Sequence, residues 1–124
     1  MSLRQPLDPI REVAIARTVH EALRAWSAAH GQPLMPAWSK APRWMKESTL
    51  ESVRFAHANP GAADSAQHDQ WMEQKRRDGW VHGETKDPDA RTHPMLIPYN
   101  ALPDMERRKD ALVRAIVAAL TDGR

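Results

Sequence analysis

The chain has 124 residues, of which 41% are hydrophobic and 27% charged, and it contains no cysteine. This size and balance favour one globular domain covering 1–124, with a core of about 10–121, and they exclude wholesale disorder. Without cysteine there is no disulfide framework, no thiolate nucleophile and no cysteine zinc site, which fits the cytoplasm. The 18 basic and 16 acidic side chains are interleaved, whereas nucleic-acid binding needs basic groups gathered on one face.

The first predicted helix begins at Pro9, because Asp8 is a suitable N-cap and proline is favoured at the first helical position. It is expected to end at His30-Gly31, since glycine readily adopts the left-handed conformation after a helix. Its apolar stripe at helical spacing comprises Ile15, Val19, Ala22, Leu23 and Trp26. Residues 31–41, which include Trp38, are predicted to form a loop. Residues 1–9 contain no apolar run of signal-peptide length, and no stretch approaches a membrane span.

Two further helices are predicted in the middle of the chain. Pro42 is expected to open the second helix, which should close at 59–61, an Asn-Pro-Gly sequence. Ser65 is expected to cap a short third helix. That helix should end at Gly79, because a glycine followed by the apolar Trp80 has the form of a Schellman ending.

The periodicity changes after the third helix. Two short apolar pieces, 80–82 and 95–97, flank the turn-rich segment 86–89, which predicts a small irregular β-hairpin. Pro103 is expected to open a fourth helix. The apolar stripe of that helix comprises Met105, Leu112, Val113, Ile116, Val117 and Leu120. The predicted fold class is therefore mainly α, with about four helices and a small irregular β-hairpin between helices three and four.

One motif spans the second half of the chain without gaps in its order and spacing. Its residues are Trp71, Lys75, Gly79-Trp80, Gly83, Lys86-Asp87, His93-Pro94, Leu96, Pro98-Tyr99, Leu102-Pro103 and Lys109-Asp110. This run resembles the signature of the RyR domain, the ryanodine receptor repeat. Upstream residues between 15 and 60 are similar to free-standing bacterial members that carry a single copy. The resemblance therefore extends over nearly the whole chain.

The resemblance implies a compact helical fold with a small β element, acting as a non-catalytic regulatory module. It also implies a cleft that accepts an adenine-nucleotide-type ligand, with Trp71 among its walls. Three residues depart from the family pattern, namely His82, Glu84 and Met95, and all three are expected to lie beside the cleft. Glu84 would place negative charge near a phosphate-bearing ligand, which argues against nucleotide binding in the family manner.

Five residues are the candidates for ligand binding. The indole of Trp71 offers a flat face for a base, and Lys75 lies one turn further along the same helical face, where it could meet a phosphate. Lys86 lies in the predicted turn, and His93 and Tyr99 complete the set. The alternatives are a core position for Trp71, a solvated side chain for Lys75, and an architectural role for His93 and Tyr99 beside their neighbouring prolines.

No pattern in the sequence indicates catalysis or a metal. His20-Glu21 looks like the opening of a zinc-protease motif, but Arg24 occupies the place of the second histidine. The six histidines include no pair at a metal-binding helical spacing, and no nucleophile-elbow, phosphate-loop, dinucleotide or calcium-loop motif is present. We therefore expect no enzyme activity and no cofactor.

The leading hypothesis is a ligand-sensing or regulatory module that binds a nucleotide-like small molecule. The alternative is a protein-interaction module, in which a single copy forms a homodimer without any small ligand. A third hypothesis, nucleic-acid binding, would use the two basic runs at 75–77 and 107–109.

Overall fold

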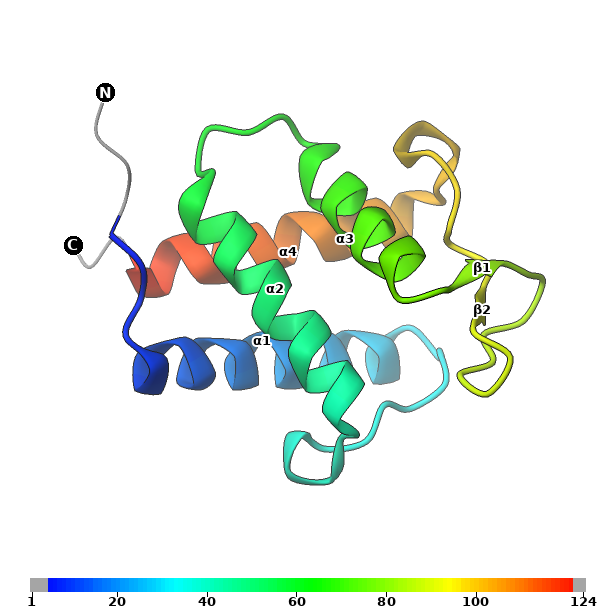
Figure 1. Ribbon diagram of the computed structural model, residues 1–124, viewed down its shortest axis with the longest axis horizontal. Helices are drawn as coiled ribbons and strands as arrows, with labels where there is room; N and C mark the ends of the chain where they lie inside the picture. The colour runs from blue at the N-terminus through cyan, green and yellow to red at the C-terminus, as the bar shows by residue number, and fades with distance from the viewer. Residues whose placement is uncertain (1–4, 122–124) are drawn as a thin grey trace.

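The computed structural model describes residues 5–121, which form four α-helices, two 3-10 turns and two short strands (Figure 1). The elements are α1 (Pro9–Ala29), η1 (Trp38–Lys40), α2 (Arg43–Ala58), α3 (Ala66–Arg77), β1 (Val81–His82), β2 (Thr92–His93), η2 (Tyr99–Ala101) and α4 (Asp104–Thr121). The predicted mainly α class is confirmed. The ends of the predicted domain, 1–4 and 122–124, lie outside the described residues. Within 5–121, no helix combines the length and the hydropathy that a membrane span needs.

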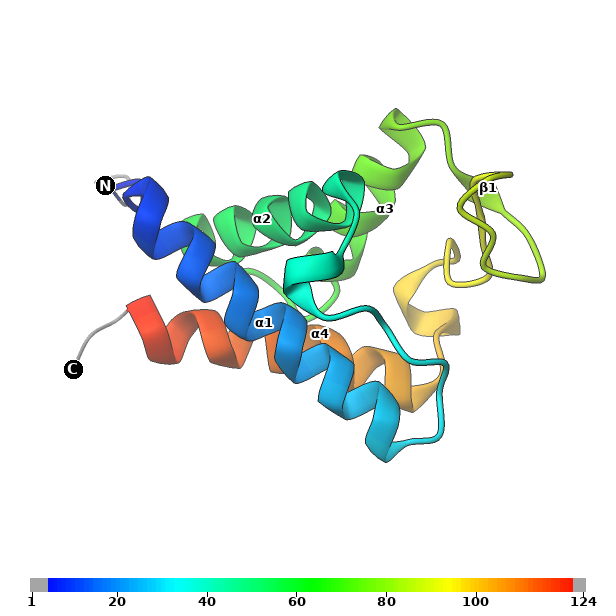
Figure 2. The same ribbon diagram turned by 90° about the horizontal axis from the view of Figure 1, so that it is seen from below.

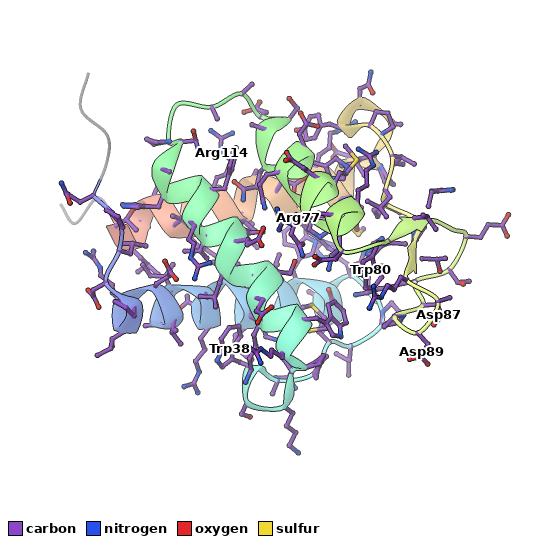
Figure 3. All side chains as sticks on the ribbon, in the orientation of Figure 1. Trp38, Arg77, Trp80, Asp87, Asp89 and Arg114 are labelled. Atoms are coloured by element: carbon purple, nitrogen blue, oxygen red, sulfur yellow. The ribbon has the colours of Figure 1, made fainter. Side chains whose placement is uncertain are left out.

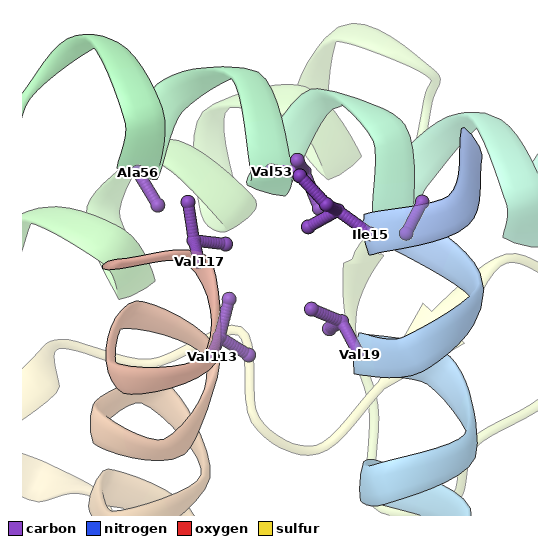
Figure 4. Close-up of a cluster of buried hydrophobic side chains, with 7 residues drawn as sticks. Ile15, Val19, Val53, Ala56, Val113 and Val117 are labelled. Atoms are coloured by element: carbon purple, nitrogen blue, oxygen red, sulfur yellow. The ribbon is translucent and has the colours of Figure 1, made fainter. Parts of the chain in front are cut away.

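Three helices, α1, α2 and α4, form the main core (Figures 1 and 2). Their buried side chains point toward one another (Figure 4) and comprise Ile15, Ala16 and Val19 from α1, Val53 and Ala56 from α2, and Val113 and Val117 from α4. Burial of each larger aliphatic side chain contributes about 1.5–3 kcal/mol. Leu120, which we predicted in the α4 stripe, is instead 41% exposed, because the last turn of α4 lies at the edge of the bundle.

The helix ends follow the predicted local chemistry in all but one case. Asp8 caps α1 by accepting a hydrogen bond from the Arg11 N–H at 2.9 Å. The Schellman ending of α3 is present: the Trp80 N–H donates to the Lys75 carbonyl, and Gly79 has a φ of 88°. Ser65 precedes α3 as predicted, but its side chain forms no capping hydrogen bond, because its backbone is already helical.

The segment between α1 and α2 is tied to α1 by the pair His20 and Glu21. The fully buried His20 ring is 2.7 Å from the Pro36 carbonyl through Nε2, and Glu21 accepts the backbone N–H of Trp38 at 2.8 Å. That N–H is the main reason why the pKa of Glu21 is lowered. The loop predicted over 31–41 therefore contains an ordered 3-10 turn at Trp38, and this pair of side chains has a structural role.

The β element lies where we predicted it, but the prediction of a hairpin was wrong. Strands β1 and β2 pair in parallel, and the second strand is at 92–93 instead of 95–97. The chain turns back within 83–91 and forms an antiparallel bridge between Asp87 and Thr92, after which it runs alongside β1 in the same direction. This close approach requires glycine at position 83, since a Cβ there would lie 2.6 Å from the Cβ of Thr92.

Candidate functional site

A second, smaller core joins α3 to the segment that follows it. Its buried residues are Met72, Trp80 and Leu96, with Trp44 and Trp71 packed partly against them. Trp80 lies beside the end of α3, and Asp87 and Asp89 lie further out in the loop (Figure 3). The Asp87 carboxylate accepts the backbone N–H groups of Asp89 and Ala90, which fixes the turn in this segment. This core holds β2 and its neighbours against α3.

In the described part of the chain, a two-lobed cavity lies between the two cores. The α4-side lobe has a volume of about 210 Å³, and its polar and aromatic walls include Gln67, His68, Trp71, Lys86, His93, Lys109 and Asp110. The α2-side lobe has a volume of about 150 Å³ and is bordered by Trp44, Ser48, Trp71, Lys75, Trp80, Lys86 and His93, among others. Trp71, Lys86 and His93 border both lobes and therefore form the junction between them.

Lys75 is a buried cation held between two indole rings. Its side chain is only 4% exposed, and its Nζ lies 4.6 Å from the Trp44 ring centroid and 4.7 Å from that of Trp80. No carboxylate in residues 5–121 forms an ion pair with it. Burial, and then the charge of Lys86, lower the pKa of Lys75 to about 8. The alternative of a solvated Lys75 is therefore wrong.

Lys86 and His93 add to the positive potential of the cavity. The Lys86 residue as a whole is exposed, yet burial of its ammonium end and the nearby charge of Lys109 lower its pKa. Burial, followed by the charges of Lys86, Lys75 and Lys109, lowers the pKa of His93 to about 3, so its ring is neutral at pH 7. Since Nδ1 of His93 accepts the Met95 N–H at 3.1 Å, its proton is on Nε2, which can donate to a ligand.

Trp71 is half-buried: its ring is neither fully enclosed by the core nor fully exposed to solvent. The His68 ring stacks on it with centroids 5.5 Å apart, and the His93 ring contacts it edge-on at 4.9 Å. Two imidazoles thus occupy much of the indole surface. The part of Trp71 that borders the cavity remains available to a flat ligand.

Of the five predicted site residues, the structure brings four together. Trp71, Lys75, Lys86 and His93 border the cavity. Tyr99 opens η2 and borders neither lobe, although its ring centroid lies 6.4 Å from that of His68. Among the three departures from the family pattern, Met95 borders the α4-side lobe. His82 and Glu84 are exposed and border neither lobe, so the expected positions of both residues beside the cavity were wrong.

Several polar residues of the site were missing from the predicted set. Gln67 and His68 lie on the same face of α3 as Trp71 and Lys75, and Glu106, Lys109 and Asp110 share a face of α4 with the core residue Val113. Helical spacing was the signal that could have found them, because residues separated by three or four positions share a face. Lys109 and Asp110 were part of the family motif, but their role as cavity walls depends on α4 packing beside α3.

The two basic runs do not form a continuous free surface. Lys75 is buried, Arg77 pairs with Glu51, and Lys109 pairs with Glu106. Arg107 and Arg108 both lie within ion-pair distance of Asp104. Within residues 5–121, no three histidine or acidic side chains are gathered in a way that could hold a metal ion.

The fold and the cavity define a small helical domain with a cation-lined internal site. The family model described as RyR domain matches residues 38–121, from η1 to the end of α4, and the chain belongs to this family. Helix α1, which the resemblance noted above includes, precedes the matched range. No curated protein matches the chain.

Proposed function

We propose that the chain is a non-enzymatic ligand-sensing module that binds a nucleotide-like anion in the two-lobed cavity. The observation that carries this proposal is the burial of Lys75 at a cavity wall without an ion-pair partner in residues 5–121. A buried charge is costly unless it is paired. An anionic group in the α2-side lobe would supply the missing partner.

The neighbouring side chains suit the same ligand. Lys86 adds a second ammonium at the junction of the lobes, and the Nε2–H of His93 adds a neutral donor. The exposed part of Trp71 supplies an apolar ring surface beside these donors. Membership of the RyR family supports a regulatory module over a catalyst, and the absence of cysteine supports a cytoplasmic location.

Calorimetric titration with a panel of nucleotides and with pyrophosphate tests this function. We expect saturable binding of at least one nucleotide, weakened about 5- to 150-fold by Trp71→Ala, because base–aromatic stacking contributes about 1–3 kcal/mol. The control is Trp26→Ala, since Trp26 lies on α1 outside both lobes and stacks on His30. Absence of binding across the whole panel, with circular dichroism showing native helix content, would contradict the proposal.

A second candidate function is self-association through the end of the bundle where α1 begins and α4 ends. Ile10 and Val13 on α1 are 85% and 44% exposed, and Leu120 on α4 is exposed as well. The two ends are adjacent, because Arg11 donates to the Leu120 carbonyl at 2.7 Å. Apolar residues grouped at one end provide the kind of surface on which a second copy can pack.

Sedimentation velocity over a wide range of concentrations tests self-association. We expect a dimer that Ile10→Glu dissociates, because a carboxylate in the interface would have to be desolvated. The matched control is Leu34→Glu, which changes another exposed aliphatic residue, in the loop before η1. A monomer at every concentration would remove this candidate and leave the ligand-binding proposal unaffected.

A further inference from the structure

Gln67, which borders the α4-side lobe, carries a buried hydrogen-bond acceptor that no group within the described residues satisfies. Gln67, on α3, is only 3% exposed, and its Nε2 donates to the Ser52 carbonyl at 2.9 Å. That bond orients the amide, so that Oε1 is the free end. Oε1 is buried, and no donor within residues 5–121 reaches it. An acceptor left in this state is unfavourable unless a bound group donates to it.

Asp110, on α4, carries a second buried acceptor and also borders the α4-side lobe. Oδ2 of Asp110 is buried, and within the described residues it accepts no hydrogen bond. The nearest basic atom is Nδ1 of His68 at 3.9 Å, which is too long for a hydrogen bond. Nε2 of His68 is 2.7 Å from the Ile97 carbonyl, so in the neutral ring the proton is on Nε2 and Nδ1 has none to donate. Burial, and then the charge of Glu106, raise the pKa of Asp110 to about 7.

The cavity therefore has two chemically different ends. The α2-side lobe presents the ammonium of Lys75, with donors from Lys86 and His93 at the junction. The α4-side lobe adds the free oxygens of Gln67 and Asp110. A simple anion such as phosphate would satisfy the cations and leave both acceptors unpaired. A ligand complementary to the whole cavity has to carry a donor as well.

We propose that Gln67 and Asp110 recognise a hydrogen-bond donor on the ligand, so that the site selects anions carrying an exocyclic amino group. Amino-purine and amino-pyrimidine nucleotides belong to this class. Their keto counterparts present an oxygen at the same position, which would face two acceptors. This inference rests on the proposed anion-binding function and adds the specificity of the same site.

Pairs of nucleoside monophosphates that differ in an amino against a keto group test the proposed specificity separately from anion binding. AMP and IMP carry the same phosphate and sugar and differ in an amino against a keto group, and CMP and UMP form a second pair. Pyrophosphate serves as an anion without the ring. At pH 7.5, above the pKa of about 7, most of the Asp110 carboxyl is ionised and acts as an acceptor. At this pH we expect AMP and CMP to bind at least about tenfold more tightly than IMP and UMP, because the keto group leaves the buried oxygens of Gln67 and Asp110 unpaired.

Substituting Asp110 tests whether this residue causes the preference for amino over keto nucleotides. Asp110→Asn keeps the shape but offers an amide N–H to a keto oxygen, so we expect the preference for the amino member of each pair to fall to within about threefold. Pyrophosphate binding should not weaken, since a negative charge has been removed. The control is Asp89→Asn, which removes the same charge from an exposed loop residue and should leave the preference unchanged.

The outcomes are distinguishable. Equal affinities within both pairs, together with measurable nucleotide binding, would overturn this inference and leave the proposed function intact. A preference that Asp110→Asn leaves at its original size would overturn the assignment to Asp110. No binding of any nucleotide or of pyrophosphate would overturn the proposed function, and this inference with it.

Discussion

Replacing Lys75 by methionine is expected to abolish anion binding and to stabilise the fold at the same time. The lowering of the Lys75 pKa from 10.5 to about 8 corresponds to about 3 kcal/mol of folding free energy lost at neutral pH. The two cation–π contacts offset part of this cost, by about 1 kcal/mol each. Methionine fills a similar volume without a charge, so the free energy of unfolding should rise by about 1 kcal/mol at pH 7.

The stability difference between this variant and the wild type should depend on pH in a defined direction. Between pH 8 and 10.5 the unfolded wild type binds a proton at Lys75 that the native state has released, so stability rises with pH in this window. The Lys75→Met variant lacks this contribution. Its advantage should therefore be largest below pH 8 and should shrink as the pH approaches 10.5, which urea unfolding at several pH values measures.

Lys75→Met is also expected to weaken nucleotide binding. Removing one partner of a buried charge pair costs about 2–5 kcal/mol, so the affinity for the best nucleotide should fall at least about 30-fold. Lys46→Met is a matched control, because the Nζ of Lys46 lies 5.4 Å from the Trp38 ring and borders neither lobe. Unchanged affinity in the Lys75→Met protein would contradict the binding role of this lysine. A free energy of unfolding below that of the wild type would contradict the cost assigned to its burial.

Truncating Trp80 to alanine should produce the largest loss of stability in this region. Trp80 is 6% exposed, packs with Met72 and Leu96, and lies 5.4 Å from the Trp44 ring. Removing a buried tryptophan typically costs about 3–5 kcal/mol, because transfer free energy is lost and a cavity is left. The indole also contacts the Lys75 ammonium, whose Nζ lies 4.7 Å from the ring centroid. We therefore expect ligand binding to be lost together with stability.

Urea unfolding and amide hydrogen exchange measure this effect. Because Trp80 belongs to the smaller core, the exchange of amides in α3 and in 81–103 should accelerate more than that of α1, α2 and α4. Val81→Ala is the control, since Val81 is the next residue but is 59% exposed and should change stability by less than about 0.5 kcal/mol. A Trp80→Ala protein within about 1 kcal/mol of the wild type would contradict the role assigned to this core.

Four titratable groups around the cavity share one property: burial shifts each of them toward its neutral form. It lowers the pKa of Lys75, of Lys86 and of His93, and it raises that of Asp110. Groups that are costly to charge inside a fold are commonly retained for binding or catalysis. Here they border one cavity and come from α3, the loop between the two strands, β2 and α4.

Much of the fold could be predicted from the chain because its helix boundaries are set by local chemistry. The Asp8 cap, the left-handed glycines at 31 and 79, and the break after Ala58 each depend on neighbouring residues alone. The parallel strands could not be predicted in this way. Their register depends on a turn at Asp87 that brings Thr92 back against Gly83, and alternation of apolar residues carries no information about that path.

For the site, the sequence by itself determined the helical framework, the family and four residues of the cavity. Only the tertiary structure decided that Lys75 is buried, because the two indoles that enclose it come from positions 44 and 80. It likewise decided that Gln67 and Asp110 share a lobe, since α3 and α4 meet only through packing. Spacing along one helix determines which side chains share a face. How deeply those side chains are buried, and which groups they contact, depends on segments that are distant in the sequence.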